Sequence, residues 1–155
     1  MYKLSWDSSL NYEELIDDFF VNYYKEAAPY MREYFELIRA NMHQIGIALN
    51  NGGCHVAEIA AGNYFQARYW PYQLLQSYEQ VLAKAYEAIE KANYNEVIAE
   101  TMRLRIRADE LFCTAYFLDS YASYLTDSEY KAMYEAYLRD AKLIGNLQGI
   151  DKEWF

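Results

Sequence analysis

Glycine and proline are scarce in this chain, with 6 glycines and 2 prolines among 155 residues. These two residues make up roughly 12% of an average protein, and turn-rich β-sandwiches, collagen-like repeats and disordered linkers all need more of them. The length suits one domain, which we expect to span residues 1–155. We therefore predict an all-α protein, an antiparallel bundle of about five helices.

Apolar residues recur at helical intervals on both sides of residue 29. Asn11 is a good N-cap in capping-box spacing with Glu14, and the apolar stripe that follows ends near residue 24 or 25. Pro29 suits the first turn of a second helix because its φ is already helical. These two helices should form a hairpin. Residues 46–70 contain Asn-Asn-Gly-Gly and are expected to be an irregular or short-helix connection.

Three further helices are expected in the second half of the chain. One begins at Pro71 and ends near residue 93, and the next is capped by Asn95 and extends to about residue 125. Since the second half of this long helix is apolar on all sides, it should lie at the centre of the bundle. Thr126 and Glu129 form a second capping box, and Gly145 is expected to end the last helix.

The charge balance argues against two classes of partner. With 14 basic and 23 acidic residues, the chain carries a net charge of −9, whereas a phosphate backbone requires clustered basic side chains. The densest basic run, Arg103, Arg105 and Arg107, is followed by acidic residues and should form salt bridges on a helix. The longest stretch without charged residues, 40–57, is interrupted by Asn, His and Gln. We therefore expect neither nucleic acid nor a membrane as partner.

The sequence contains no familiar catalytic or cofactor motif. A di-metal carboxylate bundle requires Glu-x-x-His on two helices, and this pattern is absent. Phosphate-binding loops, dinucleotide fingerprints and nucleophile elbows are also absent. Cys54 and Cys113 form no Cys-x-x-Cys pair and are expected to be free thiols. We therefore name no catalytic residue, no metal ligand and no cofactor, and whether the chain belongs to an enzyme stays open.

Residues 40–78 are almost without charge. Only Glu58 and Arg68 are charged in this range, and depletion of charge is typical of surface that another domain or subunit covers. The segment is either a deeply buried hairpin or a contact surface, for a neighbouring domain or for a second copy of the chain. Its aromatic residues, among them Tyr69 and Trp70, are either core residues or platforms on which a sugar ring stacks.

The beginning of the chain resembles a known junction between two domains. Residues 4–11 read Leu-Ser-Trp-Asp-Ser-Ser-Leu-Asn, residues 13–20 read Glu-Glu-Leu-Ile-Asp-Asp-Phe-Phe, and residues 23–30 read Tyr-Tyr-Lys-Glu-Ala-Ala-Pro-Tyr. These segments resemble a bacterial family of glycoside-hydrolase-associated domains of unknown function, related to the α-glucuronidases. In that family Leu-x-Trp-Asp-Pro-x-Leu-Asp ends the last strand of a (β/α)₈ barrel. A helix with Leu-Ile-Asp-x-Phe and then Tyr-Tyr-Gly-x-Ala-Ala-Pro follows.

The resemblance implies that the chain is only the C-terminal helical domain, trimmed from a larger multidomain protein. Residues 1–10 would be the remnant of the preceding barrel strand. Trp6 would be a stacking platform near a sugar pocket, and Asp7 would accept a hydrogen bond from a sugar hydroxyl. Together with Tyr69 and Trp70, they are the expected substrate-binding residues.

The chain departs from the family pattern at Ser8, where proline is usual, at Lys25, where glycine is usual, and in residues 46–70. We expect a non-catalytic helical module that supports a glycoside-hydrolase-like barrel. The parent would be a secreted, periplasmic or cell-surface carbohydrate-processing protein, with the barrel and an oligosaccharide as partners. The alternative is a stand-alone helical interaction protein that forms a homodimer through residues 40–78.

Overall fold

The computed structural model describes residues 11–48 and 67–148, which form five α-helices and three short 3₁₀ turns. No strand occurs in these two ranges, so the all-α prediction is confirmed. The strand remnant expected at residues 1–10 and most of the connection expected at residues 46–70 lie outside the described residues. In chain order the elements are α2 (Tyr12–Tyr24), η1 (Lys25–Ala27), α3 (Ala28–Ala48), η3 (Ala67–Tyr69), α5 (Tyr72–Lys91), α6 (Glu96–Ser120), η4 (Ala122–Tyr124) and α7 (Asp127–Gln148).

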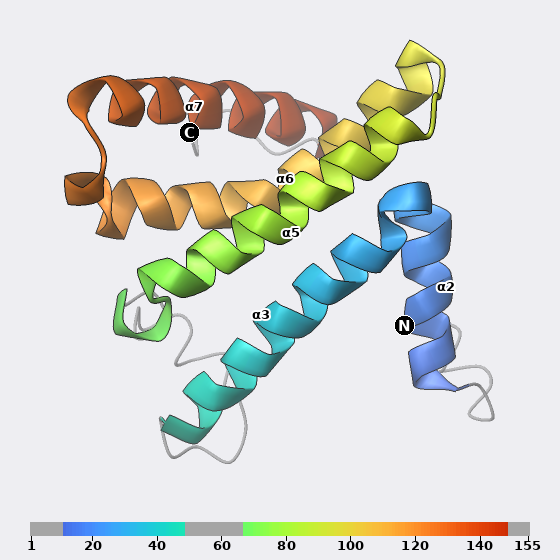
Figure 1. The fold of residues 1–155 in the computed structure, drawn as a ribbon, viewed down its shortest axis with the longest axis horizontal. Helices are drawn as coiled ribbons and strands as arrows, with labels where there is room; N and C mark the ends of the chain where they lie inside the picture. Colours follow the sequence, from blue (N-terminus) through green and yellow to red (C-terminus); the bar gives the residue numbers. More distant parts are fainter. Residues whose placement is uncertain (1–10, 49–66, 149–155) are drawn as a thin grey trace.

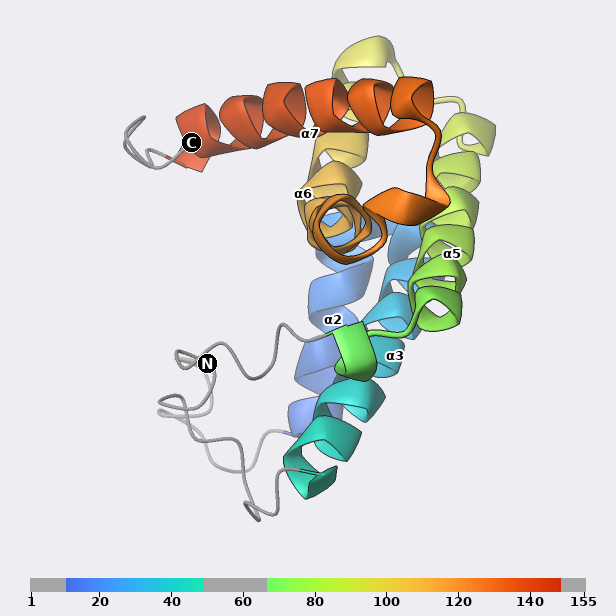
Figure 2. The same cartoon turned by 90° about the vertical axis from the view of Figure 1, so that its left-hand side faces the viewer.

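The helices pack as successive antiparallel neighbours (Figure 1). α5 and α6 lie side by side, α3 packs along α5, and α7 folds back along α6. α6 as a whole contacts α5, α7 and α2. In its second half Cys113, Tyr116 and Phe117 are buried, whereas Leu111, Phe112 and Leu118 are half-buried, so this half is less enclosed than its apolar pattern predicted. In Figure 2 part of α6 is seen end-on, with α5 and α7 against different sides of it.

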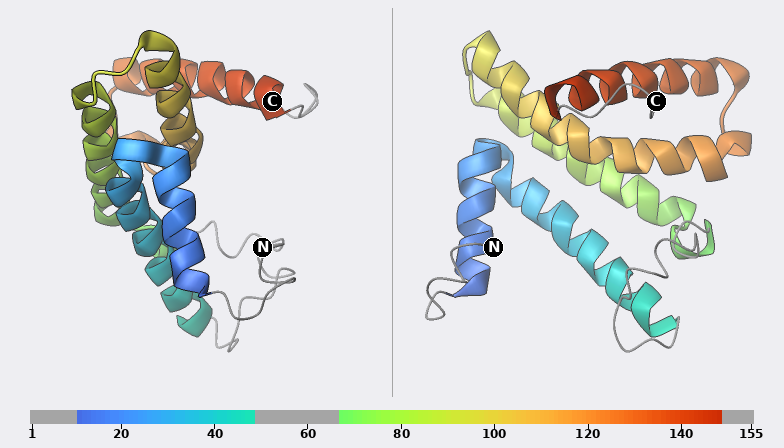
Figure 3. Two further views of the ribbon diagram at one scale, coloured as in Figure 1. Left: turned by 90° about the vertical axis from the view of Figure 1, so that its right-hand side faces the viewer. Right: turned by 180° about the vertical axis from the view of Figure 1, so that it is seen from behind.

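α2 and α3 form the hairpin predicted from the sequence, and they diverge from their junction at η1 (Figure 3). Ala27 and Ala28 at this corner are 0% and 5% exposed, and η1 packs against α5. The chain enters η1 through Lys25, which has φ 54° and ψ −123°. A positive φ is uncommon for a residue with a Cβ, so this corner has an unfavourable residue at its first position.

The helix starts agree with the predicted caps. The side-chain oxygens of Asn11 and Asn95 each accept a backbone N–H from the first turn of their helix, at 3.0 and 3.1 Å. At α7 the Glu129 N–H donates to the Thr126 hydroxyl at 3.3 Å, and the Glu129 carboxylate accepts the Thr126 N–H at 2.8 Å. These bonds satisfy backbone donors that a helix cannot satisfy itself.

The end of α6 differs from the prediction. The helix ends at Ser120 rather than near residue 125, because Tyr121 leaves helical backbone angles, with φ −127° and ψ 21°. The Tyr121 hydroxyl donates to the carbonyl of Trp70 at 2.8 Å, a bond to a segment 51 residues away. The apolar pattern of the sequence continues past Tyr121, but the helix breaks there, where the Tyr121 hydroxyl bonds to the Trp70 carbonyl.

The end of α7 also differs from the prediction. Gly145 was expected to stop the helix, and this prediction is wrong, because α7 continues through a buried Gly145 to Gln148. Ala141 and Ile144, one turn or less before it, are 2% and 9% exposed. Their packing offsets the roughly 1 kcal/mol that a glycine costs inside a helix.

The arginine run on α6 forms the ion pairs expected from the sequence. Arg103 pairs with Glu90, Glu96 and Glu100, each at 2.9 Å. Arg107 pairs with Glu100 at 3.5 Å and with Asp140 at 3.9 Å, so Glu100 is shared by the two arginines. Arg105 behaves differently, since it donates to the carbonyl of Tyr23 and its guanidinium lies 4.2 Å from the centre of the Tyr23 ring.

Candidate functional sites

Two of the four residues expected to bind substrate, Trp6 and Asp7, lie outside the described residues. Trp70 is described and is 2% exposed, with its ring centre 4.8 Å from that of Phe112 and 5.2 Å from that of Tyr116. This is the core position that one of the two interpretations of these rings predicted, rather than the exposed position that a sugar platform requires. As placed, the Trp70 indole presents almost no surface on which a sugar could stack.

Tyr69 is partly exposed and belongs to a cluster of tyrosines at one end of the molecule. This tyrosine-rich end, formed by Tyr69, Tyr72, Tyr121 and Tyr124, combines η3, the start of α5, the end of α6 and η4 (Figure 1). The rings of Tyr72 and Tyr124 stack with centres 4.7 Å apart, and Tyr124 is 65% exposed. The Asn41 amide donates to the Tyr69 carbonyl at 3.0 Å and so ties η3 to α3.

The described parts of residues 40–78 have features of both interpretations offered for this segment. Ile45, Leu75 and Tyr78 join Trp70 in the core and are at most 2% exposed, as a buried hairpin would require. Ile47, in contrast, is 58% exposed, and the rings of the tyrosine-rich end reach the surface. Among the described residues of this segment, some of the uncharged side chains therefore belong to the core, and others lie on the surface.

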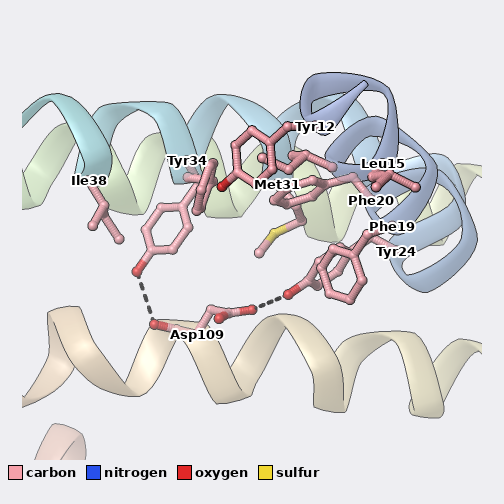
Figure 4. A pocket seen from close by; sticks show the side chains of 11 residues that line it. Tyr12, Leu15, Phe19, Phe20, Tyr24, Met31, Tyr34, Ile38 and Asp109 are labelled. Atoms are coloured by element: carbon pink, nitrogen blue, oxygen red, sulfur yellow. Dashed lines mark hydrogen bonds between the residues drawn. The ribbon is translucent and has the colours of Figure 1, made fainter. Parts of the chain in front are cut away.

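An aromatic pocket of about 550 Å³ lies between α2, α3 and α6 (Figure 4). Asp109 of α6 is the only charged residue among the described residues that line it. The size is within the usual range for small-molecule sites, which are mostly apolar with a few polar groups. The other lining residues are Tyr12, Leu15, Ile16, Phe19, Phe20, Tyr24, Met31, Tyr34, Phe35 and Ile38.

Two tyrosines, one from α2 and one from α3, form hydrogen bonds with Asp109. The Tyr24 hydroxyl of α2 donates to the Asp109 carboxylate at 2.6 Å, and the Tyr34 hydroxyl of α3 donates to the Asp109 carbonyl at 3.0 Å. Burial raises the pKa of the Asp109 carboxyl, and the hydrogen bond from Tyr24 opposes this rise. The residue is therefore fixed by three helices in a partly desolvated position.

Sequence reasoning missed Asp109 because it was assigned to the acidic end of the arginine run. A usable signal was present in its spacing, since Asp109, Phe112 and Tyr116 recur at intervals of three and four residues and so share one face of a helix. A carboxyl on an aromatic helix face is unusual. Finding the pocket also required knowing that α2 and α3 cover this face.

Three kinds of catalytic group can be compared with the described residues: a carboxyl pair, a metal site and a reactive thiol. Glycoside hydrolysis needs two carboxyl groups roughly 5–10 Å apart, and Asp109 is the only carboxyl among the described residues lining the aromatic pocket. Within residues 11–48 and 67–148, no group of three or more His, Cys, Asp or Glu side chains could hold a metal ion. Cys113 is a buried free thiol whose pKa is raised by burial to about 12, so it is a poor nucleophile.

In the described part of the chain, no helix combines the length and hydrophobicity needed to cross a membrane. The chain shows no significant match to the family models, curated proteins or solved structures with which it was compared.

Proposed function

We propose that the chain is a non-catalytic helical module that supports a glycoside-hydrolase-like barrel in a carbohydrate-processing protein. The backbone at Lys25 is the observation that carries this proposal. Its φ of 54° and ψ of −123° lie in a region that glycine adopts far more easily than other residues. The family that the chain resembles has glycine at this position. The backbone of this chain therefore has the shape that glycine suits, even though its own residue is lysine, and this supports the resemblance.

The tyrosine-rich end supports a contact with a neighbouring domain. Tyrosine is enriched at protein interfaces because its ring gives a large contact area and its hydroxyl tolerates water. Tyr124 exposes 65% of its surface while its ring stacks on Tyr72, which holds it in place before any contact forms. A preorganised aromatic surface at the edge of a charge-poor segment suits burial against a barrel domain.

The reading frame upstream of Tyr2 in the natural gene tests this proposal. We expect several hundred residues in which strands and helices alternate, as in a (β/α)₈ barrel. We also expect the isolated chain to give no calorimetric heat with acidic or neutral oligosaccharides. A natural start at Met1 would contradict the proposal, and clear micromolar binding of an oligosaccharide would contradict the view that the barrel supplies most of the sugar site.

The alternative is an interaction protein that forms a homodimer, which the sequence placed at residues 40–78; a different surface, on α7, offers a second place for such a contact. Tyr130, Tyr134 and Leu138 recur every four residues and are 37%, 44% and 40% exposed. Sedimentation velocity over a wide concentration range tests this alternative. A dimer that Tyr134→Ser weakens would support it, and a monomer at all concentrations would contradict it.

A further inference from the structure

We propose that the aromatic pocket binds an organic ammonium ligand. The cationic nitrogen would pair with the Asp109 carboxylate, and the apolar part of the ligand would lie among the rings of α2 and α3. This inference does not depend on the proposed function, because the pocket is separate from the tyrosine-rich end. Figure 4 shows the rings of Tyr24 and Tyr34 reaching toward Asp109 from above the helix that carries it.

Asp109 has no basic partner among the described residues. The two arginines nearest to it along α6 are engaged elsewhere: Arg105 with the ring and carbonyl of Tyr23, and Arg107 with Glu100 and Asp140. A partly buried carboxylate without a cation is costly, since its desolvation is offset only by hydrogen bonds. A ligand cation would supply the missing charge, which a neutral ligand could not.

The aromatic walls suit the rest of such a ligand. Ring faces attract cations within about 6 Å of the ring centre. This preference is already visible at the pocket wall, because the Arg32 guanidinium lies 5.8 Å from the ring centre of Phe20 and 5.6 Å from that of Phe35. The charge of Arg32 is compensated by three carboxylates outside the pocket. Arg32 therefore does not neutralise the negative charge of Asp109. Those carboxylates belong to Glu13, Asp17 and Glu36.

The pocket is also organised before a ligand arrives. Tyr24 and Tyr34 fix the carboxylate and the backbone of Asp109 from two helices, at 2.6 and 3.0 Å. Preorganisation reduces the ordering cost of binding. A volume of about 550 Å³ admits an amine with an aromatic or alkyl tail.

Calorimetric titration with phenethylammonium and with 2-phenylethanol, its neutral counterpart, tests the proposal. We expect the wild-type chain to bind the amine about tenfold more tightly than the alcohol. Asp109→Asn should abolish this difference, since the amide still accepts the Tyr24 hydroxyl but carries no charge. The matched control is Asp119→Asn, because Asp119 lies on the same helix in a separate hollow of about 280 Å³, and it should bind the amine as the wild type does.

A second pair of variants tests the aromatic wall without disturbing the core. Phe19 lines the pocket and is 51% exposed, whereas Val21 is 59% exposed and does not line it. Phe19→Ala should weaken amine binding several-fold, and Val21→Ala should leave it unchanged. Equal affinity for amine and alcohol, absence of amine binding at millimolar concentration, or equal losses in Asp109→Asn and Asp119→Asn would each overturn the proposal.

Discussion

At the scale of single residues, Asp109 makes the stability of the fold depend on pH. Burial raises the pKa of its carboxyl in the folded state, so the folded protein holds this proton to a higher pH than the unfolded chain does. The stabilising effect of protonation is therefore present at low pH and is lost as the pH rises through the folded pKa. The neighbouring hydroxyls of Tyr24 and Tyr34 and the thiol of Cys113 also have raised pKa values, so they stay protonated in this range.

Asp109→Asn isolates this effect. Urea unfolding of the wild type and the variant between about pH 4 and pH 7 gives the difference in their free energies of unfolding. We expect the wild type to lose stability relative to the variant as the pH rises. A difference that stays constant would mean that folding leaves the pKa of Asp109 unchanged, and a difference that moves in favour of the wild type would mean that folding lowers this pKa; either result would contradict the prediction.

Lys25 and Asn93 are the two residues other than glycine with positive φ among the described residues, at 54° and 53°. Asparagine tolerates this region better than lysine does. We expect Lys25→Gly to raise the free energy of unfolding by about 1 kcal/mol. Asn93→Gly is the matched control and should change it by much less. If the two substitutions have equal effects, the backbone at Lys25 is not under strain.

At the scale of helices, side-chain caps mark where α2, α6 and α7 begin. The Asn95 side chain accepts the Ile98 N–H at the start of α6, the helix that contacts α5, α7 and α2. Asn95→Ala should lower the free energy of unfolding by about 1 kcal/mol, since this donor would lose its partner. Asn95→Asp keeps the acceptor and should retain the stability. Thermal or urea unfolding measures both variants, and equal losses would show that the cap contributes nothing specific.

The sequence predicts helix starts better than helix ends, for a physical reason. A cap such as Asn95 or Thr126 acts within four residues, so its pattern is complete in the local sequence. The end of α6 depends on a bond between Tyr121 and the carbonyl of Trp70, and the passage of α7 through Gly145 depends on packing against α6. Neither partner can be identified from local spacing.

The candidate sites also divide into features that local sequence predicts and features that depend on tertiary packing. The charge-poor segment was visible in the sequence, and part of it contributes to the tyrosine-rich end. Burial of Trp70 in the core was one of two alternatives that the sequence left open, and its contacts with Phe112 and Tyr116 depend on the packing of α6, which local spacing does not reveal. The aromatic pocket combines residues from three helices, and its single carboxyl has meaning only once Tyr24 and Tyr34 are known to reach it.

At the scale of the whole molecule, α6 joins two regions with different proposed roles. Asp109, near the middle of α6, faces the aromatic pocket. The C-terminal end of α6 leads into the tyrosine-rich end, beside η3 and η4. The core between them, which includes Leu75, Tyr78 and Ile106, is fully buried. The described helices therefore share a core of their own, and the tyrosine-rich end is the surface that we propose a neighbouring domain covers.

Hydrogen exchange tests this central claim most directly, by comparing the isolated chain with the full product of the natural gene. If the proposed neighbouring domain covers the tyrosine-rich end, we predict that amides of residues 67–74 and 121–125 exchange more slowly in the full product. Amides of buried α5 residues such as Leu82 and Ile89 should exchange alike in both, since they lie in the core of the module. Identical exchange at the tyrosine-rich end in the two proteins would contradict the claim that this surface supports a neighbouring domain.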